Sequence, residues 1–163
     1  MSWCNRRFLL LSALALVAGC GFAPAYAPGG AGSALMGRVS VEAPDTRASY
    51  LLAQEIETRL GRPANPRYAL TPVVTLNTQA MAINRNNVAS RFNLLGTVAY
   101  SLRDTETGAI VTSGDVTSFT GYSATGTTVA VQAAERDAEA RLMAILADQV
   151  LTRLLAADLP QPE

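Results

Sequence analysis

The sequence contains no histidine and no lysine, so all 13 of its basic residues are arginines. Histidine is the commonest general base and the commonest metal ligand, and its absence removes the most frequent forms of acid–base and metal chemistry. Without lysine, the chain has neither a Schiff base nor a serine–lysine pair. These absences argue against an enzyme and favour a function in binding or assembly.

Cysteine is also scarce, with only Cys4 and Cys20 present. Cys4 falls in a segment that we expect to be removed, and Cys20 is expected to be acylated, so no internal disulfide remains. Stability must then come from packing, and 163 residues are enough for one hydrophobic core. The 13 basic residues are balanced by 13 acidic ones, which argues against a nucleic-acid partner.

The N-terminal segment has the three parts of a bacterial lipoprotein leader. Arg6 and Arg7 supply a basic n-region, an apolar run of about ten residues follows, and residues 16–20 read Leu-Val-Ala-Gly-Cys. A small-residue site that ends in cysteine is the lipobox pattern, in which the thiol receives a diacylglyceryl group and the chain is cut before the cysteine. We therefore predict a signal peptide over residues 1–19. The mature chain would begin at Cys20 with an S-diacylglyceryl and an N-acyl lipid, and no other cofactor is expected.

Three other interpretations of this segment compete with the lipobox. A membrane-spanning helix needs about twenty apolar residues, whereas this run is shorter and is followed by Gly19, Gly21 and Pro24. An ordinary signal peptide, cut after Ala25 or Ala27, would release a protein without a lipid. A buried N-terminal helix is the third alternative.

The composition divides the mature chain into three parts. Residues 20–37 are rich in proline, glycine and alanine, which predicts a lipid anchor followed by a linker. A single domain is expected over residues 38–158, and residues 159–163 form a C-terminal tail.

Periodicity predicts an α+β domain with the element order β-α-β-β-β-α. Alternation of apolar and polar residues predicts strands over residues 38–43, 68–78, 92–102 and about 109–119. Apolar residues at helical spacing predict one helix between residues 46 and 61 and a second over about residues 128–157. Strands two to four should form an antiparallel meander, and strand one should be the parallel neighbour of strand two or lie apart from it. The result is two helices packed on a four-stranded mixed sheet.

Several local features refine this prediction. Pro72 is expected to place its strand at an edge or a bulge, and Gly114 is expected to mark a bulge in the fourth strand. Residues 84–90 and 104–108 are predicted turns. Asp45 or Thr46 is expected to cap the first helix, and Thr127 or Thr128 the second. The apolar face of the second helix is predicted to comprise Ala134, Ala138, Leu142, Ile145, Leu146, Val150 and Leu154.

Candidate catalytic groups do not assemble into a known pattern. The stretch around Ser123 resembles a nucleophile elbow, but the glycine required two residues later is replaced by Thr125. We interpret residues 121–126 as the loop that enters the last helix. Asp104, Glu106 and Asp115 lack the regular spacing of a calcium loop and are expected to be solvated carboxylates, so no metal site is predicted.

The arginines are the better candidates for a binding site. Arg85, Arg91 and Arg103 lie in or beside the middle strands, on loops or on the face opposite the apolar one. The arginine guanidinium recognises phosphate and carboxylate in a bidentate manner. The competing interpretation is an ordinary solvated face.

The sequence resembles a known family at four places. Residues 20–26 read Cys-Gly-Phe-Ala-Pro-Ala-Tyr and resemble the Cys-Gly-Phe-x-Pro-x-Tyr opening of the LptE family of lipopolysaccharide-assembly lipoproteins. Residues 91–96, 118–123 and 135–138 are similar to the alphaproteobacterial branch of that family. The resemblance covers essentially the whole mature chain and implies two helices on a four-stranded sheet.

This resemblance also implies a location, partners and a function. It implies a non-enzymatic lipoprotein on the periplasmic face of the outer membrane, which plugs the LptD β-barrel, helps it to fold and binds lipopolysaccharide during export. Gly21 replaces the aspartate that retains enterobacterial lipoproteins in the inner membrane, which agrees with outer-membrane sorting. Among the basic residues, Arg85 and Arg91 are the nearest matches to the lipopolysaccharide-binding side chains of the family.

Two other functions remain as alternatives from the sequence. The first is an auxiliary lipoprotein of an ABC-type envelope lipid transporter, which would also have a lipobox and a small α/β domain. The second is an envelope hydrolase that uses Ser123.

Overall fold

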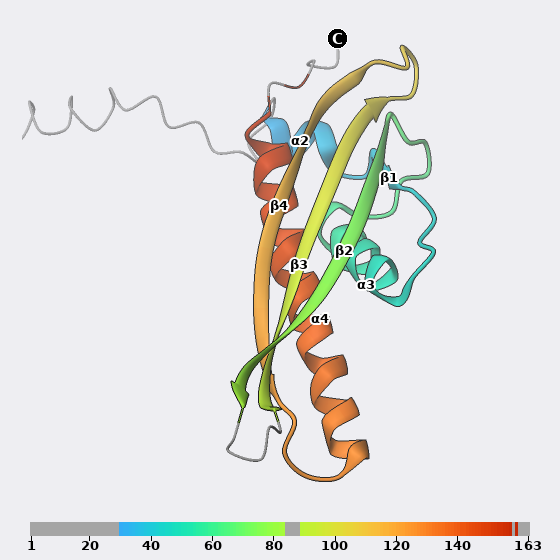
Figure 1. Cartoon of the computed structure of the whole chain (residues 1–163). Coiled ribbons are helices and arrows are strands. Elements are labelled where there is room, and N and C mark those ends of the chain that lie inside the picture. The colour runs from blue at the N-terminus through green and yellow to red at the C-terminus, as the bar shows by residue number, and fades with distance from the viewer. Residues whose placement is uncertain (1–29, 84–88, 158, 160–163) are drawn as a thin grey trace, which may run out of the picture.

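The computed structural model describes residues 30–83, 89–157 and 159, and it confirms the predicted α+β class. Three helices are arranged on one side of a four-stranded sheet (Figure 1). In chain order the elements are α2 (Ala31–Leu35), β1 (Val39–Val41), α3 (Arg47–Leu60), β2 (Tyr68–Ile83), β3 (Ala89–Asp104), β4 (Ile110–Ser123) and α4 (Thr128–Leu155).

The sheet has the strand order β1-β2-β3-β4. β1 pairs in parallel with β2, and the other pairs are antiparallel, so the predicted meander is confirmed and strand one is the parallel neighbour of strand two. β2 and β4 run beyond their predicted ends, to Ile83 and Ser123. Their last residues lose the alternation of apolar and polar side chains, but pairing with β3 continues to hold them in extended conformation.

The ends of α3 follow the predicted capping chemistry. Thr46 is the N-cap: its Oγ1 accepts a hydrogen bond from the backbone N–H of Ser49 at 3.1 Å, and Ser49 Oγ accepts one from the Thr46 N–H at 2.9 Å. This reciprocal pair satisfies two backbone donors that the helix leaves open. Asp45 supports it by accepting from Ser49 Oγ at 3.1 Å. Gly61 ends the helix with a φ of 78°, which favours glycine.

The long helix α4 packs on both the sheet and α3. Thr127 caps it, and its buried residues are Ala138, Leu142, Met143, Leu146, Ala147, Val150, Leu151 and Leu154. Ile145 was predicted in this face but is 40% exposed. Because α4 also contacts α3, its buried face turns toward Met143, Ala147 and Leu151, and Ile145 is left on the solvent side.

Two local predictions are corrected by the structure. Residues 89 and 90 belong to β3 rather than to the predicted turn, while residues 84–88 lie outside the described residues. Gly114 pairs regularly with Tyr100, and the irregularity of β4 falls between the pairs of Leu102 and Arg103. Gly114 instead makes room for the Tyr100 ring, because a Cβ there would lie 3.0 Å from the Tyr100 Oη.

The helix α2 is an element that the sequence did not predict. Residues 31–35 fall in the predicted linker, yet Ala34 and Leu35 are buried in the core. The next residues continue this attachment, since the backbone N–H of Gly37 donates to the Leu60 carbonyl at 2.7 Å. The chain is therefore bound to the domain several residues before β1 begins.

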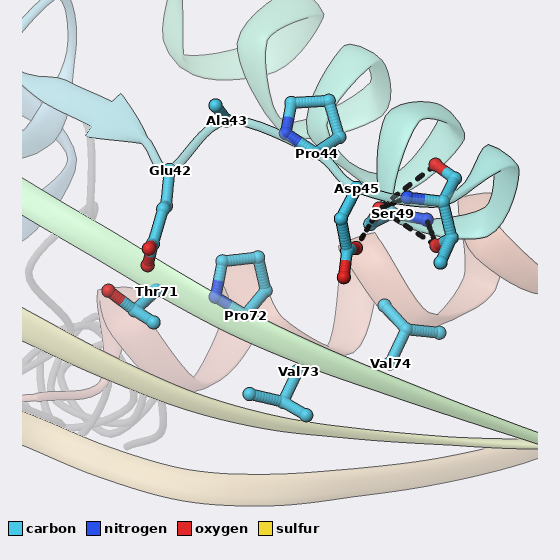
Figure 2. A pocket seen from close by; sticks show the side chains of 10 residues that line it. Glu42, Ala43, Pro44, Asp45, Ser49, Thr71, Pro72, Val73 and Val74 are labelled. Atoms are coloured by element: carbon cyan, nitrogen blue, oxygen red, sulfur yellow. Dashed lines mark hydrogen bonds between the residues drawn. The ribbon is translucent and has the colours of Figure 1, made fainter.

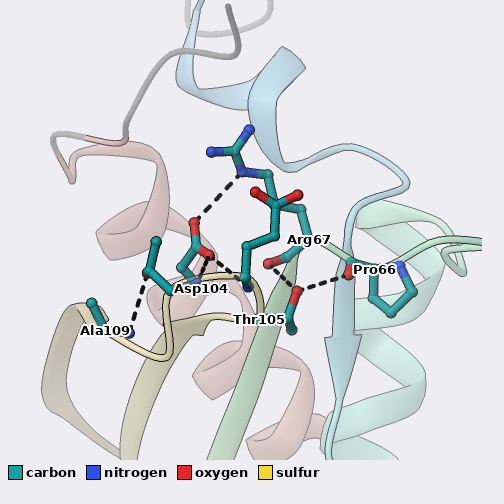
Figure 3. A network of polar contacts seen from close by, with 7 residues as sticks. Pro66, Arg67, Asp104, Thr105 and Ala109 are labelled. Carbon is teal, nitrogen blue, oxygen red and sulfur yellow. Dashed lines mark hydrogen bonds and ion pairs between the residues drawn. The ribbon is translucent and has the colours of Figure 1, made fainter.

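A buried carboxylate fixes the turn between β3 and β4 (Figure 3). Asp104 Oδ1 accepts hydrogen bonds from the backbone N–H groups of Glu106 at 2.9 Å and Thr107 at 3.0 Å. Its Oδ2 lies 3.6 Å from Nε of Arg67, at the start of β2. Thr105 Oγ1 donates to the carbonyls of Pro66 and Arg67, so the turn is held against β2.

Asp104 gives the domain a testable dependence on pH. The Thr107 N–H, followed by the Glu106 N–H and the Arg67 guanidinium, lowers the pKa of Asp104 below its ordinary value, although burial opposes the shift. A lowered pKa stabilises the fold above the unfolded-state pKa of about 3.9, and this contribution is lost as the pH falls through the folded-state pKa. We therefore expect Asp104→Asn to reduce the difference in melting temperature between pH 7 and pH 3. Glu106→Gln, in the same turn but exposed, is the control, and equal acid sensitivity of wild type and Asp104→Asn would contradict the assignment.

Candidate functional site

The sheet has one face that no described helix covers, because α2, α3 and α4 all lie on the other side (Figure 1). The strand registers place alternate residues on this open face. It comprises Thr71, Val73, Thr75, Asn77 and Gln79 of β2, Arg91, Asn93, Leu95, Thr97, Ala99, Ser101 and Arg103 of β3, and Ser113, Asp115, Thr117, Phe119, Gly121 and Ser123 of β4.

Most side chains of the open face are uncharged and polar. Threonine pairs cross its middle, where Thr97 and Thr117 place their Oγ1 atoms 3.2 Å apart. Large apolar side chains interrupt this polar surface, among them Phe119, which is 63% exposed, and Val73, which is 59% exposed. A surface of this composition offers hydrogen-bond donors and acceptors together with a few apolar contacts. It is suited to contact with another polar protein surface.

Of Arg91 and Arg103, the two candidate arginines that the structure describes, Arg91 is the one available for a ligand. It lies on the open face, opposite Ser123, at the end of the sheet remote from α2. Its side chain is exposed, and it forms no ion pair with any of the residues that the structure describes. Arg103 donates from Nη1 to the Gly108 carbonyl at 2.6 Å, so it is engaged by its own turn. Arg85 falls outside the described residues.

The strands behind Arg91 are well packed. Phe92 and Tyr122 stack on the helix side of the sheet, with ring centroids 5.5 Å apart. Burial, with a smaller contribution from Glu135, raises the pKa of Tyr122 above its ordinary value, so its hydroxyl stays protonated at neutral pH. Thr120 Oγ1 donates to the Ala138 carbonyl at 2.9 Å and joins β4 to α4. Behind Arg91, the sheet is therefore joined to α4 by packing and by a hydrogen bond.

Ser123 does not have the surroundings of a nucleophile. It ends β4, so residues 121–123 belong to the strand rather than to the predicted loop. Its Oγ lies 3.0 Å from Thr125 Oγ1 and donates toward the Ser90 carbonyl at 3.4 Å. No histidine exists in the chain to activate it. These contacts join the end of β4 to β3 and to the residues that lead into α4.

The three candidate carboxylates do not converge on a common point. Asp104 is buried in its turn, Glu106 is exposed in the same turn, and Asp115 lies on the open face in the middle of β4. Within residues 30–83, 89–157 and 159, no three metal-ligating side chains come together. None of the described helices is long and apolar enough to span a membrane.

The sequence predicts Arg91 as a candidate binding residue but does not reveal the exposed aromatic residue on the same face. The predicted fourth strand ends at Phe119, and its sequence pattern assigns no face to this residue. The pairing of Phe119 with Leu95 places it on the open face. The signal was weak because serine, threonine and glycine occupy both faces of β4, so alternation did not distinguish them.

A mixed sheet with helices on one side and a largely polar opposite face defines a small α+β domain. Solved structures that share this fold include three lipoproteins. A putative lipoprotein from Caulobacter crescentus CB15 is 27% identical, with a TM-score of 0.62 over 77% of this chain and 93% of the other. The rare lipoprotein B from Shewanella oneidensis is 10% identical, with a TM-score of 0.57 over 73% and 92% of the two chains. A minor lipoprotein from Acinetobacter baumannii is 19% identical, with a TM-score of 0.57 over 78% and 96%.

The family is shown by a match over most of the domain. The family model LptE, described as lipopolysaccharide-assembly, matches residues 36–154. No curated protein matches the chain. The chain therefore belongs to the LptE family, and the resemblance seen in its sequence is confirmed.

Proposed function

We propose that this protein is an outer-membrane lipoprotein, acylated at Cys20, that plugs the LptD β-barrel, helps it to fold and supports the export of lipopolysaccharide to the outer leaflet. The observation that carries the proposal is the open face of the sheet. Membership of the LptE family indicates that the protein takes part in lipopolysaccharide assembly. The open face is the surface through which the domain would contact a partner.

The open face has the composition that a barrel lumen requires. The interior of a transmembrane β-barrel is polar, so a plug must offer hydrogen-bonding groups rather than a continuous apolar surface. Threonine, serine, asparagine and glutamine dominate the middle of the open face, and charged residues on it are restricted to Arg91, Arg103 and Asp115. A largely uncharged polar face can hydrogen-bond to the wall without burying unpaired charges.

The arrangement around Arg91 supports recognition of lipopolysaccharide. The guanidinium is free of ion pairs among the described residues, and the neighbouring row of the sheet carries Gln79 and Asn93. A guanidinium binds phosphate through two parallel hydrogen bonds, and side-chain amides bind sugar hydroxyls. In this proposal Arg91 binds a phosphate of lipopolysaccharide, and Arg85, which lies outside the described residues, is the second basic residue assigned to lipopolysaccharide.

Reversing the charge of Arg91 should separate lipopolysaccharide binding from partner binding. A charge-assisted hydrogen bond contributes about 1.5–3 kcal/mol, so Arg91→Asp is expected to weaken binding of purified lipopolysaccharide roughly 10-fold or more. The barrel should still be recovered, because Arg91 lies at one end of the open face and the threonine-rich middle of that face is unchanged. Arg153→Asp, which changes an exposed arginine on α4, is the matched control. Equal affinity of Arg91→Asp and wild type for lipopolysaccharide would show that Arg91 is an ordinary solvated side chain and does not bind this ligand.

Co-purification from membranes tests the proposed partner. We expect the full-length protein, purified from detergent-solubilised outer membranes, to recover one large β-barrel protein in a stable stoichiometric ratio. Recovery of an inner-membrane ATPase complex without a barrel would instead support the auxiliary lipoprotein of an ABC-type transporter.

A further inference from the structure

Most of β2 has a free edge. β1 pairs only with Tyr68, Ala69 and Leu70, and the chain then turns away toward α3. Beyond that point β2 continues to Ile83 with β3 on one side and, among the residues that the structure describes, no strand on the other. A row of backbone groups along this edge is therefore available to another strand.

The hydrogen bonds to β1 show which backbone groups point to the free edge. The Tyr68 N–H donates to the Arg38 carbonyl at 3.0 Å, and the Leu70 carbonyl accepts from the Glu42 N–H at 2.9 Å. The β2–β3 register is unbroken as far as Ala80. Even-numbered residues of β2 therefore direct both N–H and C=O away from β3, namely Val74, Leu76, Thr78 and Ala80.

Pro72 belongs to this even-numbered set. Its missing N–H would have pointed to the edge, so proline is accommodated without losing a hydrogen bond to β3. The prediction that Pro72 marks a strand edge is thus confirmed. The donors that follow it are intact, which leaves a continuous pairing edge from Val74 to the irregularity at residues 80–83.

The composition of this edge does not prevent pairing. Exposed edge strands are usually protected by charged residues, but residues 71–83 include none. Large apolar side chains are exposed on both faces of the strand: Val73 at 59% on the open face and Leu76 at 37% on the helix side. Met81, near the end of the strand, is 56% exposed. The opposite edge of the sheet, on β4, carries Asp115 near its middle.

A groove continues the line of β1 along this edge (Figure 2). It has a volume of about 310 Å³ and lies between residues 42–46 and residues 71–74 of β2. The carboxylates of Glu42 and Asp45 are directed toward it. Asp45 accepts a hydrogen bond from Ser49 Oγ, and neither carboxylate has an ion-pair partner among the described residues. The groove is thus acidic where it meets the uncharged edge.

We infer that an extended segment of the barrel partner adds to the free edge of β2 as an additional strand, with a basic residue beside Glu42 and Asp45. The inference rests on the proposed function, because it takes the barrel as the partner. Backbone hydrogen bonds to the even-numbered residues provide affinity, and Val73 on the open face and Leu76 on the helix side offer one apolar contact to each face of the segment. A second copy of this chain fits less well, since residues 71–83 carry no cation to offer the two carboxylates.

Amide exchange in the purified complex tests strand addition residue by residue. The amides of Val74, Leu76 and Thr78 should exchange at least about 10-fold more slowly in the complex than in the isolated protein. Amides of Thr75 and Asn77 point to β3 and should change little, because they are hydrogen-bonded in both states. This alternation distinguishes strand pairing from a contact made by side chains alone.

Two substitutions at one position provide the matched variants. Thr78→Pro removes the N–H that points to the free edge but keeps the hydrogen bonds to β3, whereas Thr78→Ala keeps both. We expect Thr78→Pro to lower recovery of the barrel and Thr78→Ala to leave it unchanged, with similar melting temperatures for the two. Glu42→Arg should also lower recovery, and Glu106→Arg, in the turn between β3 and β4, is its control.

Each outcome of these experiments has a definite meaning. Recovery of the barrel with unchanged exchange at Val74, Leu76 and Thr78 overturns strand addition and leaves the proposed function intact. Slow exchange at these amides in the isolated protein, together with a doubled mass, assigns the edge to a second copy and also overturns the inference. Failure to recover any barrel from wild type removes the proposed function and the inference with it.

Discussion

Replacing Gly96 with alanine is expected to destabilise the domain by about 1–3 kcal/mol, because α4 passes directly over this residue. A Cβ at Gly96 would lie 2.9 Å from Cδ1 of Leu146 and 3.0 Å from Cδ2 of Leu142. Both leucines are fully buried, so moving their methyl groups away from a new Cβ would disturb the packing around them. Gly96→Val should be more severe and should loosen the contact between α4 and the sheet. Chemical denaturation followed by circular dichroism measures both effects.

Gly121 is the matched control for this substitution. It is also a strand glycine, but a Cβ there would meet Asn93 Oδ1 at 3.4 Å, which is an ordinary contact on the open face. Gly121→Ala should be neutral or slightly stabilising, because alanine reduces the entropy of the unfolded chain. A comparable loss of stability in Gly96→Ala and Gly121→Ala would show that helix packing is not the cause.

A double-mutant cycle ties the effect to Leu146. Leu146→Val alone should destabilise the domain by leaving a small cavity. Combined with Gly96→Ala, the shorter side chain makes room for the new methyl group, so the double variant should lose less stability than the sum of the single variants. Strict additivity would mean that the two positions do not compete for the same space.

The close packing at Gly96 shows how far the sequence predicted the fold. Alternation from Phe92 to Leu102 identified the buried face of β3 correctly, because every second residue from Leu94 to Leu102 is buried. The caps of α3 and α4 were also predictable, since Thr46 and Thr127 act through local hydrogen bonds. Local chemistry and strict periodicity are the signals that a single sequence carries well.

Features that depend on distant parts of the chain were harder to predict. The helix α2 is too short and too rich in alanine and glycine to be recognised, and it is stabilised by burial of Leu35 against elements far along the chain. The length of β2 depends on pairing with β3, which its own pattern of residues does not reveal. The free edge of β2 is also a consequence of how early β1 ends, so it became evident only in the sheet.

The candidate site was predictable in part. Arg91 and Arg103 have the same residue type and lie on the same strand, and periodicity does not separate them; the family resemblance favoured Arg91 over Arg103. The turn at Gly108 captures the guanidinium of Arg103 and leaves Arg91 free among the described residues. The distinction depends on a backbone carbonyl brought into reach by the turn, which periodicity does not encode.

Substitution of Cys20 is expected to have the largest effect on the location of the protein. In the proposed function this residue carries the lipid, and a single acyl chain binds membranes only weakly, with a constant on the order of 10⁴ M⁻¹, whereas two or more chains anchor a protein stably. Loss of all the chains at once should therefore release the protein from the membrane. The alternative signal peptide, cut after Ala25 or Ala27, predicts no change, because Cys20 would then be discarded.

The experiment must separate acylation from two other sources of membrane retention. To avoid an uncleaved apolar leader, residues 1–19 are replaced by an ordinary cleavable signal peptide in Cys20→Ala, and the cells are depleted of the barrel so that a partner cannot retain the protein. We expect this variant to incorporate no labelled palmitate and to fractionate with periplasmic proteins, while wild type incorporates the label and stays with membranes. Cys4→Ala, in which the other cysteine of the chain is changed, should behave as wild type. Normal incorporation of palmitate by Cys20→Ala would exclude Cys20 as the site of acylation, and with it the interpretation of residues 16–20 as a lipobox.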